Sequence, residues 1–149
     1  MELAHLIGKT GKPFTFKVEQ RHIRQFAQAI GDANRLYTDE EYAKNTPHKG
    51  IVAPLTFPVA VTPDNENDAL DLGLDYRRML HGEQQFFYTR PIRVGEMLYC
   101  QMKVTDVYEK EGKNGMMEFI LFDTEIKDEN GGHIVTSRTN IVYRPLVLN

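Results

Sequence analysis

The feature that most constrains the fold is a change of pattern near residue 82, from mixed helical and irregular segments to strands alone. The clearest strand is residues 98–105, where apolar side chains alternate with polar ones at the period of a half-buried strand. Strand patterns cover residues 86–88, 98–105, 116–126 and 134–143, and turn-forming residues lie at 112–115 and 128–132. Short turns between successive strands predict an antiparallel sheet.

The first part of the chain predicts one strand and two helices. Residues 14–18 alternate as a short strand. The next apolar residues have helical spacing: Ile23, Phe26, Ala27 and Ile30. We expect this helix to end at Gly31. Thr38, with Glu41 three residues later, forms a capping-box pattern that predicts a second short helix over residues 39–44.

An apolar segment, PLTFPVAVT at residues 54–62, follows these helices. Pro54 suits a first helical turn and Pro58 lies inside, so we expect a buried, kinked helix, although a short apolar run also fits a strand. Residues 64–80 are polar and irregular, with a weak helical signal over 76–80, and predict a surface excursion.

Together these patterns predict an α+β fold. We expect one domain over residues 1–149, with a curved antiparallel sheet wrapped around a central apolar helix. A sheet of this kind leaves an edge strand that can pair with a second copy or another chain.

The composition excludes several classes of function. Hydrophobic residues make up 41% and charged residues 26%, as in soluble globular proteins. The formal charge of −3 predicts no nucleic-acid partner, and no apolar run is long enough to span a membrane. Cys100 is the single cysteine, and no secretory signal pattern precedes the domain, so we expect a cytoplasmic protein. The five histidines are scattered, which predicts no metal site.

Three motifs resemble one known family. They are GD-x-N-x-L-x-x-D at residues 31–39, IVAPLTF at 51–57 and HGEQQFFYTRPIRVGEML at 81–98. Together they resemble the N-terminal, FAS1-like dehydratase domain of the MaoC-like (R)-specific hydratases and dehydratases, over roughly residues 13–144. The stretch RPIRVGE at residues 90–96 is the most specific part. This resemblance implies a hot-dog fold.

The resemblance also implies acyl-thioester chemistry. Enzymes of this family hydrate a 2-enoyl thioester or dehydrate an (R)-3-hydroxyacyl thioester. An Asp and a His five residues apart act as acid and base, and a backbone N–H at the start of the hot-dog helix stabilises the enolate oxygen. The resemblance implies no cofactor beyond the coenzyme A or carrier-protein phosphopantetheine of the substrate itself.

Two parts of that catalytic pattern are altered here. Asp32 takes the acid position and Asn34 its usual neighbour, but Tyr37 stands at the His position. A phenol with a pKa near 10 is a poor base at neutral pH. Pro54 stands at the oxyanion-hole glycine, and proline has no N–H to donate. We therefore expect a degenerate hot dog that pairs with a catalytic MaoC-like subunit, or a homodimer with another task.

The candidate site residues each have a structural alternative. The catalytic candidates are Asp32, Tyr37 and His81, and the substrate-binding candidates are Asn34, Pro54, Leu55, Gly82, Arg90 and Arg93. Asp32 can close a helix end instead, Tyr37 can be a packed aromatic, and His81 a surface residue. Arg90 and Arg93, with Arg138 and Arg144, either clamp substrate phosphates or form the solvated face of the sheet.

The leading hypothesis is a hot-dog subunit that binds the acyl chain of an (R)-3-hydroxyacyl-thioester dehydratase or enoyl-thioester hydratase, while a second chain supplies the catalytic pair. One alternative is a non-enzymatic homodimer that binds acyl-coenzyme A. Another is an acyl thioesterase that uses Asp32 or Glu83 as its carboxylate.

Overall fold

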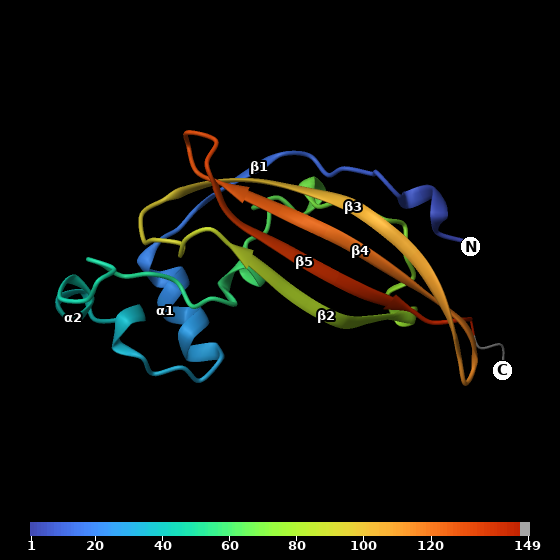
Figure 1. Ribbon diagram of the computed structural model, residues 1–149, viewed down its shortest axis with the longest axis horizontal. Helices are drawn as coiled ribbons and strands as arrows, with labels where there is room; N and C mark the ends of the chain where they lie inside the picture. The colour runs from blue at the N-terminus through green and yellow to red at the C-terminus, as the bar shows by residue number, and fades with distance from the viewer. Residues whose placement is uncertain (147–149) are drawn as a thin grey trace.

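The structure, a computed structural model, describes residues 1–146 and contains a five-stranded antiparallel sheet in the order β1-β3-β4-β5-β2 (Figure 1). The strands are β1 Phe14–Lys17, β2 Met79–Tyr88, β3 Met97–Gly112, β4 Gly115–Lys127 and β5 His133–Tyr143. The α-helices are α1 Gln20–Ala29 and α2 Glu40–Lys44. The 3-10 helices are η1 Ala4–Leu6, η2 Arg35–Tyr37, η3 Phe57–Ala60, η4 Glu66–Asp68 and η5 Tyr76–Arg78. The α+β class and the antiparallel sheet are therefore confirmed.

The first half of β3 follows the predicted alternation. In β3, Leu98, Cys100 and Val104 are buried and Met102 is half-buried, while residues 99, 101 and 103 are exposed. This strand is longer than the predicted segment 98–105, because its pairing with β4 continues through a bulge after Val104 to the turn at Gly112. One buried face along this part of β3 explains why the pattern could be recognised from the sequence.

Both α-helices lie at one end of the sheet (Figure 1). Helix α1 buries Ile23 and Ala27, as its spacing predicts, and Phe26 packs edge-to-face on Phe57 with ring centroids 5.5 Å apart. Helix α2 lies where expected, but the cap assigned to Thr38 is wrong. Asp39 is the cap, because its carboxylate accepts the Tyr42 N–H. Thr38 instead closes the preceding 3-10 turn.

The predicted central helix over residues 54–62 is wrong. Only η3, Phe57–Ala60, forms there, and no long helix lies over the sheet within residues 1–146. Two prolines in so short a segment remove two N–H donors, and a helix needs a longer run to outweigh its nucleation cost. The segment nevertheless supplies the core, since Phe57 and Pro58 are buried.

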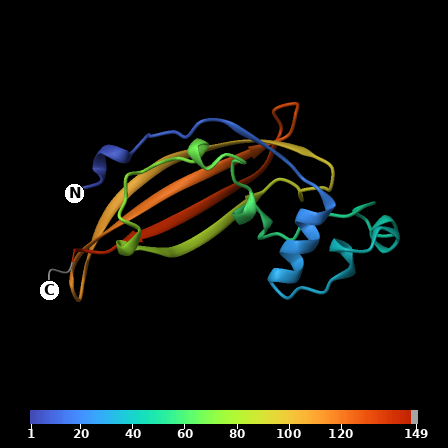
Figure 2. The ribbon, with the colours of Figure 1, turned by 180° about the vertical axis from the view of Figure 1, so that it is seen from behind.

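The expected surface excursion over residues 64–80 is only partly external. Its weak helical signal corresponds to η5, and β2 begins at Met79, well before the predicted start at Phe86. Figure 2 shows this segment running past one face of the sheet before it enters β2. Three leucines of the segment pack against a buried cluster: Leu70, Leu72 and Leu74.

The core consists of two clusters, one toward each end of the sheet. We call the end with α1 and α2 the helical end, and its cluster includes Phe57, Ile92 and Leu98. The other end carries the β3–β4 turn and the C-terminal residues (Figure 1), and we call it the hairpin end. Its cluster includes Ile120 and Tyr143. The candidate residues are divided between these two ends.

Candidate functional site

The polar residues of the loop after α1 bind their own backbone. Gly31 adopts a φ of 71°, which L side chains disfavour, and lets the Asp32 N–H reach the Ala27 carbonyl at 2.9 Å. A carboxylate oxygen of Asp32 accepts the Asn34 N–H at 3.0 Å, and the Asn34 amide oxygen accepts the Leu36 N–H at 3.0 Å. Both side chains are exposed. They order the loop, and Asp32 retains a second carboxylate oxygen toward solvent.

Tyr37 lies at the end of this loop, half-buried against the helical-end core. Burial first, and the nearby Asp32 carboxylate second, raise the pKa of its phenol above the ordinary value. The phenol is therefore protonated at neutral pH. It can donate a hydrogen bond, but it cannot act as the base that an imidazole would supply at this position.

Pro54 and Leu55 begin the apolar segment beside β2. Pro54 is buried, and the preceding Ala53 N–H donates to the Ile92 carbonyl at 2.8 Å. The Leu55 side chain is 60% exposed, while its carbonyl accepts the Tyr88 hydroxyl at 2.8 Å. Burial raises the pKa of Tyr88, which keeps this donor protonated. The hydrogen bond from Tyr88 to Leu55 holds this segment against β2. The sequence does not predict it, because the two residues are far apart in the chain.

His81 and Gly82 lie on β2 toward the hairpin end, near the start of the strand. Seven residues separate His81 from Tyr88, which at the strand rise places them about 20 Å apart. The structure therefore does not bring His81 together with Asp32 and Tyr37 in this chain. Its ring contacts the Gln84 side chain at 2.8 Å, and Gln84 in turn donates to the Ser137 hydroxyl at 2.7 Å.

Gly82 sits in an irregularity of the β2–β5 pairing. A β-carbon at this position would lie 2.9 Å from a methyl of Val142 and 3.2 Å from the Asn140 carbonyl oxygen. The close approach of β5 explains why glycine occupies this position.

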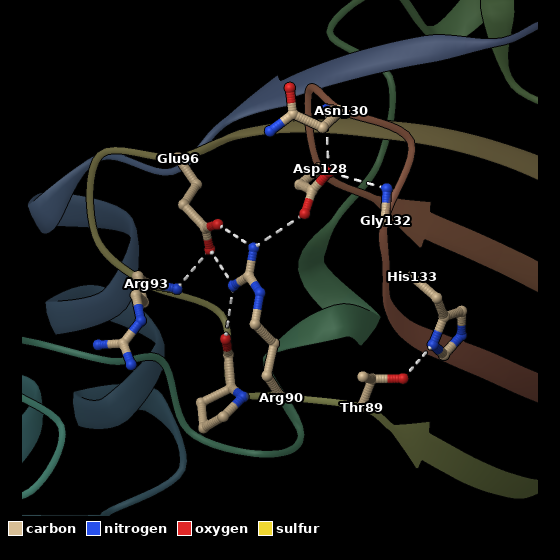
Figure 3. Close-up of polar contacts among 9 residues, drawn as sticks. Thr89, Arg90, Arg93, Glu96, Asp128, Asn130, Gly132 and His133 are labelled. Carbon is tan, nitrogen blue, oxygen red and sulfur yellow. Dashed lines mark hydrogen bonds and ion pairs between the residues drawn. The ribbon is translucent and has the colours of Figure 1, made fainter.

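Arg90 is held by carboxylates at the helical end (Figure 3). Its guanidinium contacts both oxygens of Glu96, at 2.5 and 3.1 Å, and lies 3.6 Å from Asp128. Asp128 also accepts the N–H groups of Gly132 and Asn130. These two backbone bonds and then Arg90 hold the pKa of Asp128 below its ordinary value. Arg90 thus joins the RPIRVGE turn to the β4–β5 turn.

The other three arginines proposed to bind phosphates differ in their surroundings. Arg93 donates through its guanidinium to the His48 carbonyl, and its own N–H donates to Glu96. Arg138 pairs with Asp123 at 2.8 Å and lies over the Phe87 ring. Arg144 contacts only backbone carbonyls and lines a cavity at the hairpin end. Within residues 1–146, neither the Arg93 nor the Arg144 guanidinium pairs with a carboxylate, and of these two Arg144 lines the cavity.

A hydroxyl–imidazole chain beside Arg90 was not predicted. Thr89 and Thr136 flank the His133 ring at 2.6 and 2.8 Å, and Thr136 donates its proton to Glu125 (Figure 3 shows the Thr89 contact). Because Thr136 uses its proton on Glu125, the imidazole Nε2 must donate to it, and Nδ1 accepts from Thr89. Strand pairing between β4 and β5 creates this arrangement, which sequence spacing does not reveal.

No group of three or more His, Cys, Asp or Glu residues within residues 1–146 could hold a metal ion. In the same range, no helix is long and apolar enough to cross a membrane.

Comparison with known proteins identifies relatives over almost the whole chain. Residues 5–137 match the family described as "FAS1-like, dehydratase domain region". The chain is 36% identical to a UPF0336 protein of Thermobifida fusca over 135 residues, covering 89% of this chain and 86% of that protein. It is also 36% identical to a UPF0336 protein of Streptomyces coelicolor over 143 residues, covering 93% of each chain.

Solved structures with the same fold include subunits of two complexes from Mycobacterium tuberculosis. A chain of the C-terminally truncated HadBC (3R-hydroxyacyl-ACP dehydratase) complex matches with a TM-score of 0.76 and 22% identity, covering 92% of this chain and 96% of that one. A chain of the ChsH1-ChsH2 complex matches with a TM-score of 0.78 and 20% identity, covering 99% and 90%. The extent of the family match and the shared fold establish that this chain belongs to the FAS1-like dehydratase-domain family, with a MaoC-like hot-dog fold.

Proposed function

We propose that this chain is the acyl-thioester-binding, non-catalytic subunit of an (R)-3-hydroxyacyl-thioester dehydratase or enoyl-thioester hydratase. In this proposal, a separate hot-dog chain supplies the catalytic Asp and His. The thioester is carried by coenzyme A or by a carrier-protein phosphopantetheine, and no other cofactor takes part. The subunit completes the dimer and helps to form the site for the acyl chain.

The observation that carries the proposal is the combination of Tyr37 and Pro54. Removing an α-proton or activating water at neutral pH needs a base whose pKa is near 7, and the Tyr37 phenol has its pKa raised above the ordinary value. The Asp32 carboxylate remains on an exposed loop, and Tyr37 stands where the family pattern has its imidazole. This loop can order the site without completing the acid–base pair.

The second half of the argument concerns the enolate oxygen. In the family pattern, a backbone N–H at position 54 would stabilise the charge that develops there, and Pro54 has none. Losing one such donor costs roughly 2.7–4 kcal/mol of transition-state stabilisation. The segment also lacks the long helix whose N-terminal dipole would add to that stabilisation, since only η3 forms.

The sheet offers an edge for the partner. Strand β2 pairs with β5 on one side, and within residues 1–146 no strand pairs with its other side. A ten-residue edge carries enough unpaired backbone groups to add a strand from a second chain. Both M. tuberculosis structures that share this fold are two-protein complexes by their names, which favours a heteromeric assembly here as well.

The proposal is tested by measuring hydration of crotonyl-coenzyme A by the purified chain alone, and by the chain co-expressed with a hot-dog protein that carries an intact Asp-x4-His. We expect activity only in the co-purified complex. Turnover by the chain alone at the rate of an intact hydratase would refute the non-catalytic role.

Two further measurements separate the alternatives. Tight binding of acyl-coenzyme A by a homodimer, with no turnover and no complex with the catalytic chain, would favour a binding protein instead. Release of free thiol from an acyl thioester would favour a thioesterase; Asp32 and Glu83, its candidate carboxylates, lie on the α1–η2 loop and on β2 respectively.

A further inference from the structure

A cavity of about 590 Å³ opens at the hairpin end, away from the α1–η2 loop and Pro54. It lies between the β3–β4 turn, η5 and the residues that follow β5. These three segments are far apart in sequence and meet at the same end of the sheet in Figure 1. The volume is within the range of small-molecule sites.

The lining of this cavity is strongly cationic. Its charged side chains are four basic residues and one acid: Arg77, Arg78, Lys113, Arg144 and Asp75. Asp75 is already engaged by Arg77, with a nitrogen–oxygen distance of 2.9 Å. The remaining three cations therefore face the cavity without a carboxylate of the lining to neutralise them.

Two of these cations are held in place by neutral groups. Arg144 donates to the carbonyls of Arg77 and Arg78, which fix its position, and no carboxylate within residues 1–146 pairs with it. Arg78 donates to the Arg144 carbonyl at 2.8 Å, and its guanidinium lies 4.1 Å from the centre of the Tyr143 ring. Its ion pair with Glu2 is long, at 3.5 Å, and Asp75, the other nearby acid, is engaged by Arg77. Pre-ordered guanidinium groups of this kind suit a phosphate.

Lys113 adds a third cation to the lining, from the β3–β4 turn. It lies in the tight turn between Gly112 and Gly115, exposed, and its ammonium makes no hydrogen bond or ion pair within residues 1–146. The other part of the lining is apolar: Met117, Pro145 and Leu146. The cavity thus places an anion-binding wall beside a surface for an apolar or aromatic group.

We propose that this cavity binds an organic phosphate of about nucleotide size. The phosphate lies among Arg78, Arg144 and Lys113, and the organic part lies against Met117 and Pro145. Two sources share this chemistry: a free or coenzyme-bound nucleotide, and a phosphopantetheine arm. The inference stands on the cavity alone and does not require the proposed dehydratase role.

Calorimetric titration of the purified chain with adenosine monophosphate, phosphopantetheine and inorganic phosphate tests the inference. We expect at least one of the organic phosphates to bind more tightly than inorganic phosphate, because only they contact the apolar wall. Whichever organic phosphate binds more tightly identifies the source. We also expect the affinity to fall as salt is raised, since the attraction is electrostatic.

Substitutions locate the binding. Lys113→Gln removes one unpaired cation from an exposed turn and is expected to weaken binding about tenfold with no change in folding. Arg144→Gln is expected to weaken it at least as much, with circular dichroism to confirm that the sheet is intact. Lys44→Gln, on exposed α2 at the other end, changes the net charge equally and serves as the matched control.

Two results would overturn the inference. One is a calorimetric titration at low salt in which neither organic phosphate produces a heat of binding. The other is equal weakening by Lys113→Gln and Lys44→Gln, which would show non-specific attraction. Binding without dehydratase activity in any complex would leave the inference intact and refute only the proposed function, whereas activity without binding would do the reverse.

Discussion

Residues of the loop after α1 that match the hydratase pattern make hydrogen bonds that order the loop itself. Asp32 and Asn34 each accept a backbone N–H, which gives both residues a structural role in this loop. Tyr37 packs on the core and keeps its proton. The exchange of an imidazole for a phenol could be recognised from the sequence, because it depends on residue type. The contact of Tyr88 with Leu55 could not, because it joins residues far apart in the chain.

The residue-level proposal predicts a gain of activity. In the double variant Tyr37→His with Pro54→Gly, both missing groups are supplied, and we expect crotonyl-coenzyme A hydration by the isolated chain to rise by roughly a hundredfold or more. The variant Tyr37→Phe with Pro54→Gly is the control, because it supplies the N–H but no base. Equal gains in both double variants would contradict the role assigned to position 37. Initial rates with the purified chains provide the measurement.

At the scale of elements, strands were predicted well and helical segments less well. The alternation in the first half of β3 reflects one buried face, whereas β5 buries consecutive residues, Ile134 to Ser137, on both of its faces. The prediction of a helix over residues 54–62 is wrong because apolar content does not distinguish a buried helix from a buried irregular segment. Strand β2 was predicted too short, because its first residues expose polar side chains and alternate poorly.

Gly82 gives a prediction about the pairing of β2 with β5. Gly82→Ala would place a β-carbon 2.9 Å from Val142 and 3.2 Å from the Asn140 carbonyl, so one strand must shift. We expect a loss of about 1–3 kcal/mol in the free energy of unfolding, measured by urea denaturation. Gly50→Ala is the matched control, since no atom lies within 4 Å of its β-carbon, and its effect should stay within about 0.5 kcal/mol. Similar losses in both variants would contradict the steric explanation.

The turn between β4 and β5 gives a pH prediction. The pKa of Asp128 is lowered below its ordinary 3.8 by the Gly132 and Asn130 N–H groups and by Arg90. A lowered pKa in the folded state means that the carboxylate stabilises the fold above pH 3.8 and that this contribution is lost as the pH falls through the lower value. Thermal unfolding temperatures recorded from neutral pH downward should therefore fall in this acid range.

Asp128→Asn separates this effect from general acid unfolding. The variant should be less stable than the wild type at neutral pH and should lose less stability on acidification, so the two curves converge below pH 3.8. Glu129→Gln is the control, because the exposed Glu129 carboxylate makes no hydrogen bond within residues 1–146. Parallel curves for the wild type and Asp128→Asn would contradict the assigned role.

For the whole molecule, the two ends of the sheet are chemically different. The helical end holds the altered catalytic loop, the apolar segment and the Arg90 ion pairs. The hairpin end holds the cationic cavity, which Arg144 and Lys113 both line. Strand β2 connects the two ends along one edge of the sheet, so a partner that pairs with β2 would lie alongside both.

Hydrogen exchange tests the use of this edge. Half of the β2 amides point away from β5, and in the isolated chain these should exchange with solvent quickly. We expect peptides from residues 79–88 to become protected when the chain forms the proposed complex with an intact dehydratase subunit. Peptides from β4 provide the control, because this strand has neighbours on both sides in the isolated chain. Unchanged exchange in β2 within an active complex would place the interface elsewhere.

The sequence by itself determined the α+β class, the antiparallel strands and the family, because these depend on local periodicity and on residue types in short motifs. It also led to the prediction that Tyr37 and Pro54 replace catalytic groups of the family pattern. Only the tertiary structure decided which candidates share a location. In the structure, the His81 ring contacts Gln84 on β2, away from the Asp32 loop. Arg90 pairs with Glu96, and Lys113 and Arg144 line the same cavity. These contacts depend on strand register and on the path of the loops. Both bring together residues that are far apart in the chain, so the spacing of the residues in the sequence does not predict the distance between them.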